Sequence, residues 1–247
     1  MSTTWATARR ELWLFALLAG APAFAIAAVF HVHPWATPIK AQADNFQWAL
    51  TGAYVAAGAL GVLCLPWTKV AHTPPVSDGR GWMRMGAWSL GLGLLYGAMD
   101  MAISRLTPWG AHLAAVDRRN GFSTTFVNVH PPWSVLHYFH ASIISESAFR
   151  LGPILILTWL VTRPTRGRFE AVAFWAFALL SAFIEPIEKA IMVRKWGLFG
   201  ETPMEHLLTV ESVAWQFVFA VLLRRFGWAA PILARFGYYL VVRCFHQ

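Results

Sequence analysis

Residues 137–153, HYFHASIISESAFRLGP, place a glutamate and an arginine inside a stretch that is otherwise typical of an apolar helix. The apolar run continues on both sides, over residues 134–161. That is long enough to cross a bilayer core of roughly 30 Å, which needs about 20 mostly apolar residues. Charged side chains at that depth are costly, and they usually face the interior of a helical bundle. The stretch therefore predicts a membrane-spanning helix with a polar inner face.

The rest of the chain has the composition of a polytopic membrane protein. Of its 247 residues, 57% are hydrophobic and only 13% are charged, and the mean hydropathy is +0.49. Further apolar runs fall at residues 12–30, 47–66, 84–104, 169–192, 205–223 and 228–245. We expect an all-α integral membrane bundle of six or seven transmembrane helices. It would form a single domain, residues 1–247, with a longer loop at residues 105–133.

The last apolar run, residues 228–245, allows two placements. It contains Arg235 and Arg243 within a short apolar segment. A short amphipathic helix with basic residues can lie in the membrane interface instead of crossing it. The sequence leaves both arrangements open for residues 228–245.

The distribution of basic residues predicts an orientation. With the N-terminus in the cytoplasm, ten Lys and Arg residues fall in cytoplasmic loops and six fall outside, as the positive-inside rule requires. We therefore expect an integral protein of the cytoplasmic (inner) membrane. The net charge of +8 suits contact with anionic lipid head groups, and no spacing indicates nucleic-acid recognition. Cys64 and Cys244 lie in or beside apolar runs and are expected to be packing residues.

Acidic residues inside the predicted spans are unusually frequent: Asp100, Glu146, Glu185, Glu188 and Glu211. The comparably buried cations are expected to be Arg150 and Lys189. Residues four apart share a helix face, which predicts the pairs Glu146–Arg150 and Glu185–Lys189. About three carboxylates then lack a cationic partner, so they should be protonated or meet a positive charge on a ligand.

This imbalance predicts proton-driven chemistry on a hydrophobic substrate, without a cofactor and without a metal. A carboxylic acid can protonate an alkene, and carboxylates and indole faces can then stabilise the carbocation. The predicted proton donor is Asp100, hydrogen-bonded to Tyr96. Glu146 and Trp215 are the predicted cation stabilisers, and Glu185 is the predicted base for the final proton.

Four other polar residues complete the predicted substrate site: Arg150, Glu188, Glu211 and His140. Arg150 would hold Glu146 in its ionised form. The leading hypothesis is therefore an isomerase or cyclase of a hydrophobic isoprenoid or sterol-like substrate in the lipid bilayer. A non-enzymatic protein that binds lipids or amphiphiles remains an alternative, and the sequence leaves a homo-oligomer open.

A second enzymatic alternative comes from the histidines near two predicted helix ends: His31, His33, His130, His137 and His140. On one membrane face they could hold iron or copper, as in a metal-dependent membrane oxygenase. The membrane desaturase patterns HxxxH and HxxHH are not matched, and His137-x-x-His140 comes closest. The simpler interpretation is interfacial histidines that are hydrogen-bonded to loop backbone.

Two family resemblances bear on these hypotheses. Residues 145–150, SESAFR, resemble the EExxxR motif of CAAX-protease-like membrane peptidases, except that Ser145 replaces the first glutamate. That resemblance stops at one helix. Residues 146–155, ESAFRLGPIL, together with Tyr96-Gly-Ala-Met-Asp100 and Glu211-Ser-Val-Ala-Trp215, resemble the emopamil-binding-protein (EXPERA) family of sterol isomerases and sigma-2-type receptors.

The EXPERA resemblance covers residues 85–223 and keeps the order acid, acid, tryptophan. It implies a helical cavity in which acids protonate a sterol-like or terpenoid alkene while Trp215 and Glu146 stabilise the cation. This chain departs from the pattern at two positions: Tyr96 stands where the family has histidine, and Asp100 where it has glutamate. Both departures bear on which substrate is bound. They bear less on the expected chemistry, which is protonation followed by isomerisation or cyclisation.

Overall fold

The computed structural model describes the backbone of residues 2–32, 45–75, 77–107, 133–195 and 203–244, and the side chains of residues 4–25, 50–75, 77–107, 134–187 and 210–242. All regular structure in those stretches is helical. In chain order the elements are α1 Ser2–Val32, α3 Asn45–Cys64, η2 Leu65–Trp67, α4 Gly79–Leu106, α6 Trp133–Glu146, η4 Ser147–Leu155, α7 Ile156–Thr162, α8 Glu170–Lys195, α9 Pro203–Phe226, α10 Ala229–Tyr239 and η5 Leu240–Cys244. The prediction of an all-α fold is confirmed for the described residues.

Three helical stretches among the described residues are long and apolar enough to cross a membrane: Leu50–Trp67, Ser134–Thr162 and Glu170–Ile187. They coincide with three of the predicted spans and support a helical membrane protein. The apolar stretch Ala229–Val242 is shorter. At 1.5 Å per residue it measures about 21 Å, which is less than the bilayer core.

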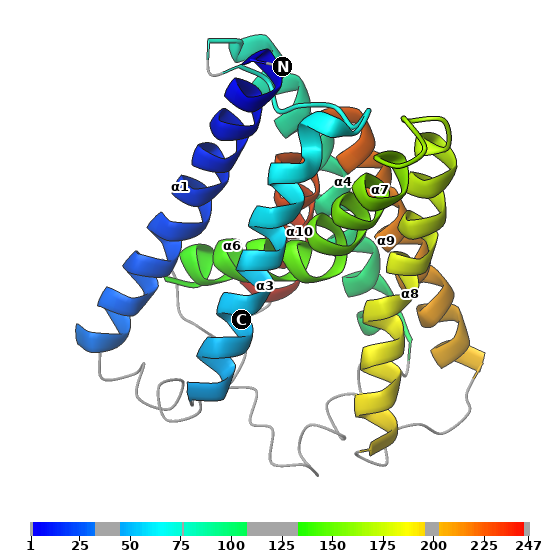
Figure 1. Ribbon diagram of the computed structural model, residues 1–247. Coiled ribbons are helices and arrows are strands. Elements are labelled where there is room, and N and C mark those ends of the chain that lie inside the picture. Colours follow the sequence, from blue (N-terminus) through cyan, green and yellow to red (C-terminus); the bar gives the residue numbers. More distant parts are fainter. Residues whose placement is uncertain (1, 33–44, 76, 108–132, 196–202, 245–247) are drawn as a thin grey trace.

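The long helix that begins at Trp133 is continuous but irregular. Figure 1 shows α6 lying across α1 and α3, whereas α7 runs on towards the end of the bundle where the N-terminus lies. Between them, η4 is a π-helix that contains Pro153. Pro153 has no N–H, so it cannot donate to the carbonyl of Phe149 four residues earlier. The hydroxyl of Ser181 on α8 donates to that carbonyl, which ties the irregular segment to its neighbour.

Glycines allow two pairs of elements to approach with backbones almost in contact. On α3, a Cβ at Gly61 would collide with the carbonyl oxygen of Leu151 in η4. On α4, a Cβ at Gly93 would collide with the carbonyl oxygen of Ala234 in α10. Small residues at such crossings are the usual means of close helix packing in membranes. They place η4 and α10 in the centre of the bundle.

The helix α10 is a core element. Most of its side chains are buried, among them Ile232, Ala234 and Arg235. It packs against α4, α6 and α9. Arg235 on this helix has polar partners inside the bundle, which the alternative of a helix in the membrane interface does not predict.

One end of the bundle is held by a buried acid, Glu11. Its Oε2 accepts hydrogen bonds from Trp228 Nε1 at 2.8 Å and from the hydroxyl of Thr73, and its Oε1 pairs with Arg10. Nearby, Gly227 has φ +87°, and a Cβ there would lie 2.8 Å from the backbone nitrogen of Thr73. A left-handed glycine is needed at this turn so that α10 can reverse direction beside α9. These contacts position α10 for the site below.

Candidate functional site

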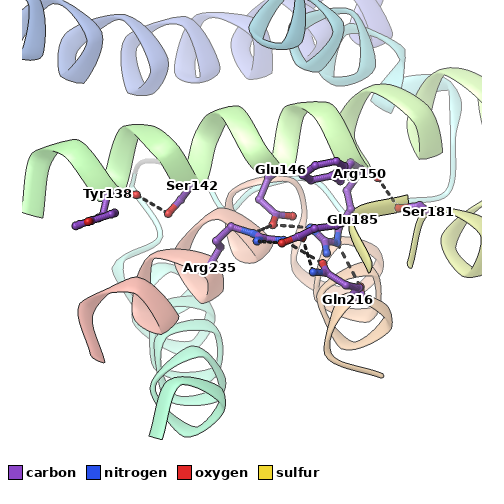
Figure 2. A network of polar contacts seen from close by, with 9 residues as sticks. Tyr138, Ser142, Glu146, Arg150, Ser181, Glu185, Gln216 and Arg235 are labelled. Atoms are coloured by element: carbon purple, nitrogen blue, oxygen red, sulfur yellow. Dashed lines mark hydrogen bonds and ion pairs between the residues drawn. The ribbon is translucent and has the colours of Figure 1, made fainter. Parts of the chain in front are cut away.

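Five polar side chains are buried together where α6, η4, α8, α9 and α10 meet, and we call them the core ion cluster (Figure 2): Glu146, Arg150, Glu185, Gln216 and Arg235. None of the five residues is more than 6% exposed. Charged side chains are rarely buried in a helical bundle unless they pair with a side chain of opposite charge. Figure 2 shows that the side chains point towards one another from these separate elements.

Arg235 is the centre of the core ion cluster. Its Nε donates to Glu146 Oε1 at 2.6 Å. Its Nη1 and Nη2 donate to the two carboxylate oxygens of Glu185 at 3.1 and 2.6 Å, and Nη2 also reaches Gln216 Oε1 at 3.0 Å. A planar guanidinium matches a carboxylate in this two-pronged way, which a lysine cannot reproduce.

Arg150 closes the cluster from the other side. Its Nη1 donates to Glu146 Oε1 at 2.5 Å, so the predicted pair one helical turn apart is present. Its Nε reaches the backbone carbonyl oxygen of Gln216 at 3.3 Å, and the Gln216 amide donates to Glu185. The ring of Phe219 lies under both guanidiniums, 5.1 Å from Arg150 Cζ and 5.6 Å from Arg235 Cζ. The positive charges therefore have favourable partners on several sides.

The core ion cluster lies far from the end of the bundle that carries Glu11. Glu185 follows Glu170, the first residue of α8, by fifteen residues, which is about 22 Å along a helix. Gln216 precedes Arg224 by eight residues, or about 12 Å. Glu170 and Arg224 are themselves paired, with Arg224 Nη2 donating to Glu170 Oε2 at 2.8 Å. On α8 the cluster therefore lies near the opposite end of the apolar stretch Glu170–Ile187 from Glu170.

The structure corrects the predicted charge balance. Arg235 is a buried cation in addition to the predicted Arg150, and it is a partner of Glu185. The predicted pair of Glu185 with Lys189 stays a prediction, because the side chain of Lys189 lies outside the described residues. Among the described residues, two carboxylates face two guanidiniums, so their opposite charges balance. Protonation of either carboxylate would leave a buried arginine without its counter-charge, which costs several kcal/mol. Glu146 and Glu185 are therefore suited to holding arginines in place and poorly suited to donating protons.

A second group, which we call the aromatic acid group, lies beside the cluster: Tyr96, Asp100, Trp215 and Tyr238. The hydroxyl of Tyr238 donates to Asp100 Oδ2 at 2.7 Å. The ring of Tyr96 is stacked between Trp215 and Tyr238, with centroids 4.8 and 4.4 Å away. Asp100 thus faces a neutral phenol, and the predicted position of Tyr96 as its hydrogen-bond partner is taken by Tyr238.

The two groups touch through one ring. Phe219 packs edge-on against Tyr96, with centroids 6.2 Å apart, while its face meets the arginines of the core ion cluster. Glu211 lies on α9 one turn before Trp215 and is partly buried. The sequence predicted one shared set of acids, and the structure divides it: Glu146 and Glu185 bind arginines, and Asp100 binds a phenol.

Several other predicted site residues have side chains outside the part of the chain that the structure describes. The side chains of Glu188 and Lys189 lie outside the described residues, as do those of His31, His33 and His130. His137 and His140 lie on α6, and in the part of the chain that is described no three His, Cys, Asp or Glu side chains are grouped in a way that could hold a metal ion. The histidine alternative therefore remains a prediction from the sequence.

A signal for Arg235 was present in the sequence. An arginine within an apolar run rich in alanine and glycine indicates a buried partner as readily as an interfacial position. The run contains no acid, however, and the carboxylates that bind Arg235 lie 89 and 50 residues away.

Comparison of the chain with protein-family models, with curated proteins and with solved structures gives no match.

Proposed function

We propose that the protein is a membrane-embedded isomerase or cyclase of a hydrophobic isoprenoid, with Asp100 as the acid. The observation that carries the proposal is the contact between Asp100 and Tyr238, at 2.7 Å, next to the stacked rings of Tyr96 and Trp215. A carboxyl group held by a phenol can take up and release a proton without leaving an arginine unpaired. The carboxylates of the core ion cluster lack that freedom.

The chemistry follows from these neighbours. The Asp100 carboxyl transfers its proton to one alkene carbon, and the alkene π electrons form the new C–H bond. The resulting carbocation is stabilised by the Asp100 carboxylate and by the electron-rich outer faces of the ring stack, those of Trp215 and Tyr238. Loss of a proton from a neighbouring carbon to the carboxylate forms a shifted double bond and restores the acid. Atoms and charge balance without a cofactor.

The role of Glu185 changes in this proposal. Its carboxylate is bound to Arg235 through both oxygens, so Asp100 itself becomes the base for the final proton. Glu146 on α6 and Glu185 on α8 act as positioning residues that hold α10, and with it Tyr238, through Arg235. The sequence order of Asp100 and Trp215 that resembles the EXPERA family supports the same chemistry.

The test is isotope incorporation. Membranes that contain the protein are incubated in D₂O with a set of geranylgeranyl and sterol alkenes. Mass spectrometry then identifies products that have the elemental formula of the substrate apart from exchanged deuterium. Proton-driven isomerisation introduces one deuterium at a former alkene carbon. Asp100→Asn should abolish this incorporation, whereas Asp78→Asn, the same change at the exposed N-cap of α4, should leave it intact. Incorporation that survives in Asp100→Asn would remove Asp100 from the mechanism.

The same group supports one second candidate function. A carboxylate next to a stack of ring faces also attracts an ammonium group. Tight binding of a lipophilic amine that depends on Asp100, with no deuterium incorporated into any alkene, would assign the protein to ligand binding instead of catalysis.

We also infer a bundle of six or seven spans in the inner membrane with its N-terminus in the cytoplasm. Support comes from contacts that bring three basic segments together at one end of the bundle, as expected for a cytoplasmic face. Arg10 Nη2 donates to the carbonyl oxygen of Thr73, and the backbone N–H of Lys69 donates to Glu170, the partner of Arg224. A cysteine at exposed Ser77 should react with an impermeant maleimide only after the cells are opened. Reaction in intact cells would reverse the orientation.

A further inference from the structure

One carboxylate oxygen and one guanidinium nitrogen in the core ion cluster have no partner. Glu146 Oε2 and Arg150 Nη2 are both buried, and neither has a hydrogen-bond partner among the described residues. The two residues are 0% and 1% exposed. Their other polar side-chain atoms are all engaged: Glu146 Oε1 accepts from both arginines, and Arg150 Nη1 and Nε each donate.

The two unpartnered atoms belong to a carboxylate and a guanidinium that bind each other. Oε2 shares a carbon with Oε1, and Nη2 shares a carbon with Nη1, so both flank the 2.5 Å contact between Oε1 and Nη1. One of them is an acceptor and the other is a donor. Buried polar groups in native proteins nearly always have partners, and a charged group left without one is the most costly case.

The chemistry of the missing partner follows from this pair. An ammonium group only donates and a carboxylate or ether only accepts, so each would satisfy one atom and leave the other. A hydroxyl group does both, since it donates to Glu146 Oε2 and accepts from Arg150 Nη2. Arg150 also belongs to the π-helix η4, and such segments recur at functional sites.

We propose that Glu146 and Arg150 form a hydroxyl-binding site at the centre of the bundle, occupied by water or by the alcohol head of a hydrophobic ligand. The site is separate from Asp100 and does not depend on the proposed reaction. Its ligand is recognised by the ability to donate and accept at one oxygen atom.

The first test compares three probes on the purified wild-type protein: geranylgeraniol, its methyl ether, and the corresponding hydrocarbon. Apparent Kd values are obtained from the shift of the thermal unfolding midpoint with ligand concentration. An alcohol occupant should bind at least about tenfold more tightly than the methyl ether, because the ether cannot donate to the carboxylate. Glu146→Gln should abolish this preference, because the preference depends on donation to the carboxylate, whereas Glu170→Gln, the same change at the separate pair with Arg224, should keep it.

The second test is an experimental structure of the protein in lipid without added alcohol. If the protein binds the alcohol no more tightly than the methyl ether, an ordered oxygen within hydrogen-bond distance of both Oε2 and Nη2 assigns the site to water. Absence of both the preference and the oxygen, or a protein side chain bonded to both atoms, would overturn the proposal. Both wild-type readouts hold even if Glu146→Gln fails to fold, and neither changes if Asp100→Asn retains activity.

Discussion

Replacement of Arg235 by methionine removes the centre of the core ion cluster. The substitution keeps a long apolar side chain but deletes four hydrogen bonds, one to Glu146, two to Glu185 and one to Gln216. Glu185 loses the guanidinium that binds both of its oxygens, within the apolar stretch Glu170–Ile187. Breaking one partner of a buried ion pair costs about 3–5 kcal/mol, less than the sum of the individual bonds.

The assay is thermal unfolding of the purified protein in detergent. For a chain of this size about 1 kcal/mol corresponds to roughly 2–4 °C, so Arg235→Met should lower the midpoint by roughly 6–20 °C. Arg225→Met is the matched control. Arg225 is exposed on α9, and its loss should change the unfolding free energy by no more than about 0.5 kcal/mol.

A double variant separates charge from packing. Arg235→Met with Glu185→Gln restores neutrality, because Glu146 and Arg150 then form a one-to-one pair. It should recover at least about 1–2 kcal/mol relative to Arg235→Met alone. The reasoning is refuted if Arg235→Met unfolds within a few degrees of the Arg225→Met control, or if the second substitution destabilises the protein further.

Three other changes test separate parts of the structure. Gly227→Ala should destabilise the fold by at least about 1 kcal/mol in thermal unfolding, since alanine is strained at φ +87° and would press on the backbone of a neighbouring loop. Ser181→Ala should cost about 1 kcal/mol by removing the donor to the Phe149 carbonyl, whereas Ser77→Ala at an exposed turn should be neutral; equal midpoints would contradict this. Tyr238→Phe should slow deuterium incorporation by on the order of tenfold without abolishing it, and an unchanged rate would separate the phenol from the acid.

Local periodicity predicted the parts of the site that lie on one helix. The Glu146–Arg150 pair follows from the spacing of one helical turn, and the structure has it at 2.5 Å. The same rule predicted a partner for Glu185 four residues along its own helix. The carboxylate binds Arg235 on α10 through both oxygens, a contact between distant elements that helical spacing does not predict. The predicted contact with Lys189 lies outside the described residues.

By itself the sequence determined the helical class and the membrane-length apolar stretches, because hydrophobicity and helical spacing are properties of consecutive residues. It also determined that several acids lie within those stretches. The tertiary structure alone decided their states. It placed Arg235 between Glu146 and Glu185 and placed Tyr238 against Asp100, across 138 residues of chain. Whether a buried carboxylate serves as an ion-pair partner or as an acid depends on which distant side chain packs against it, and no local pattern contains that information.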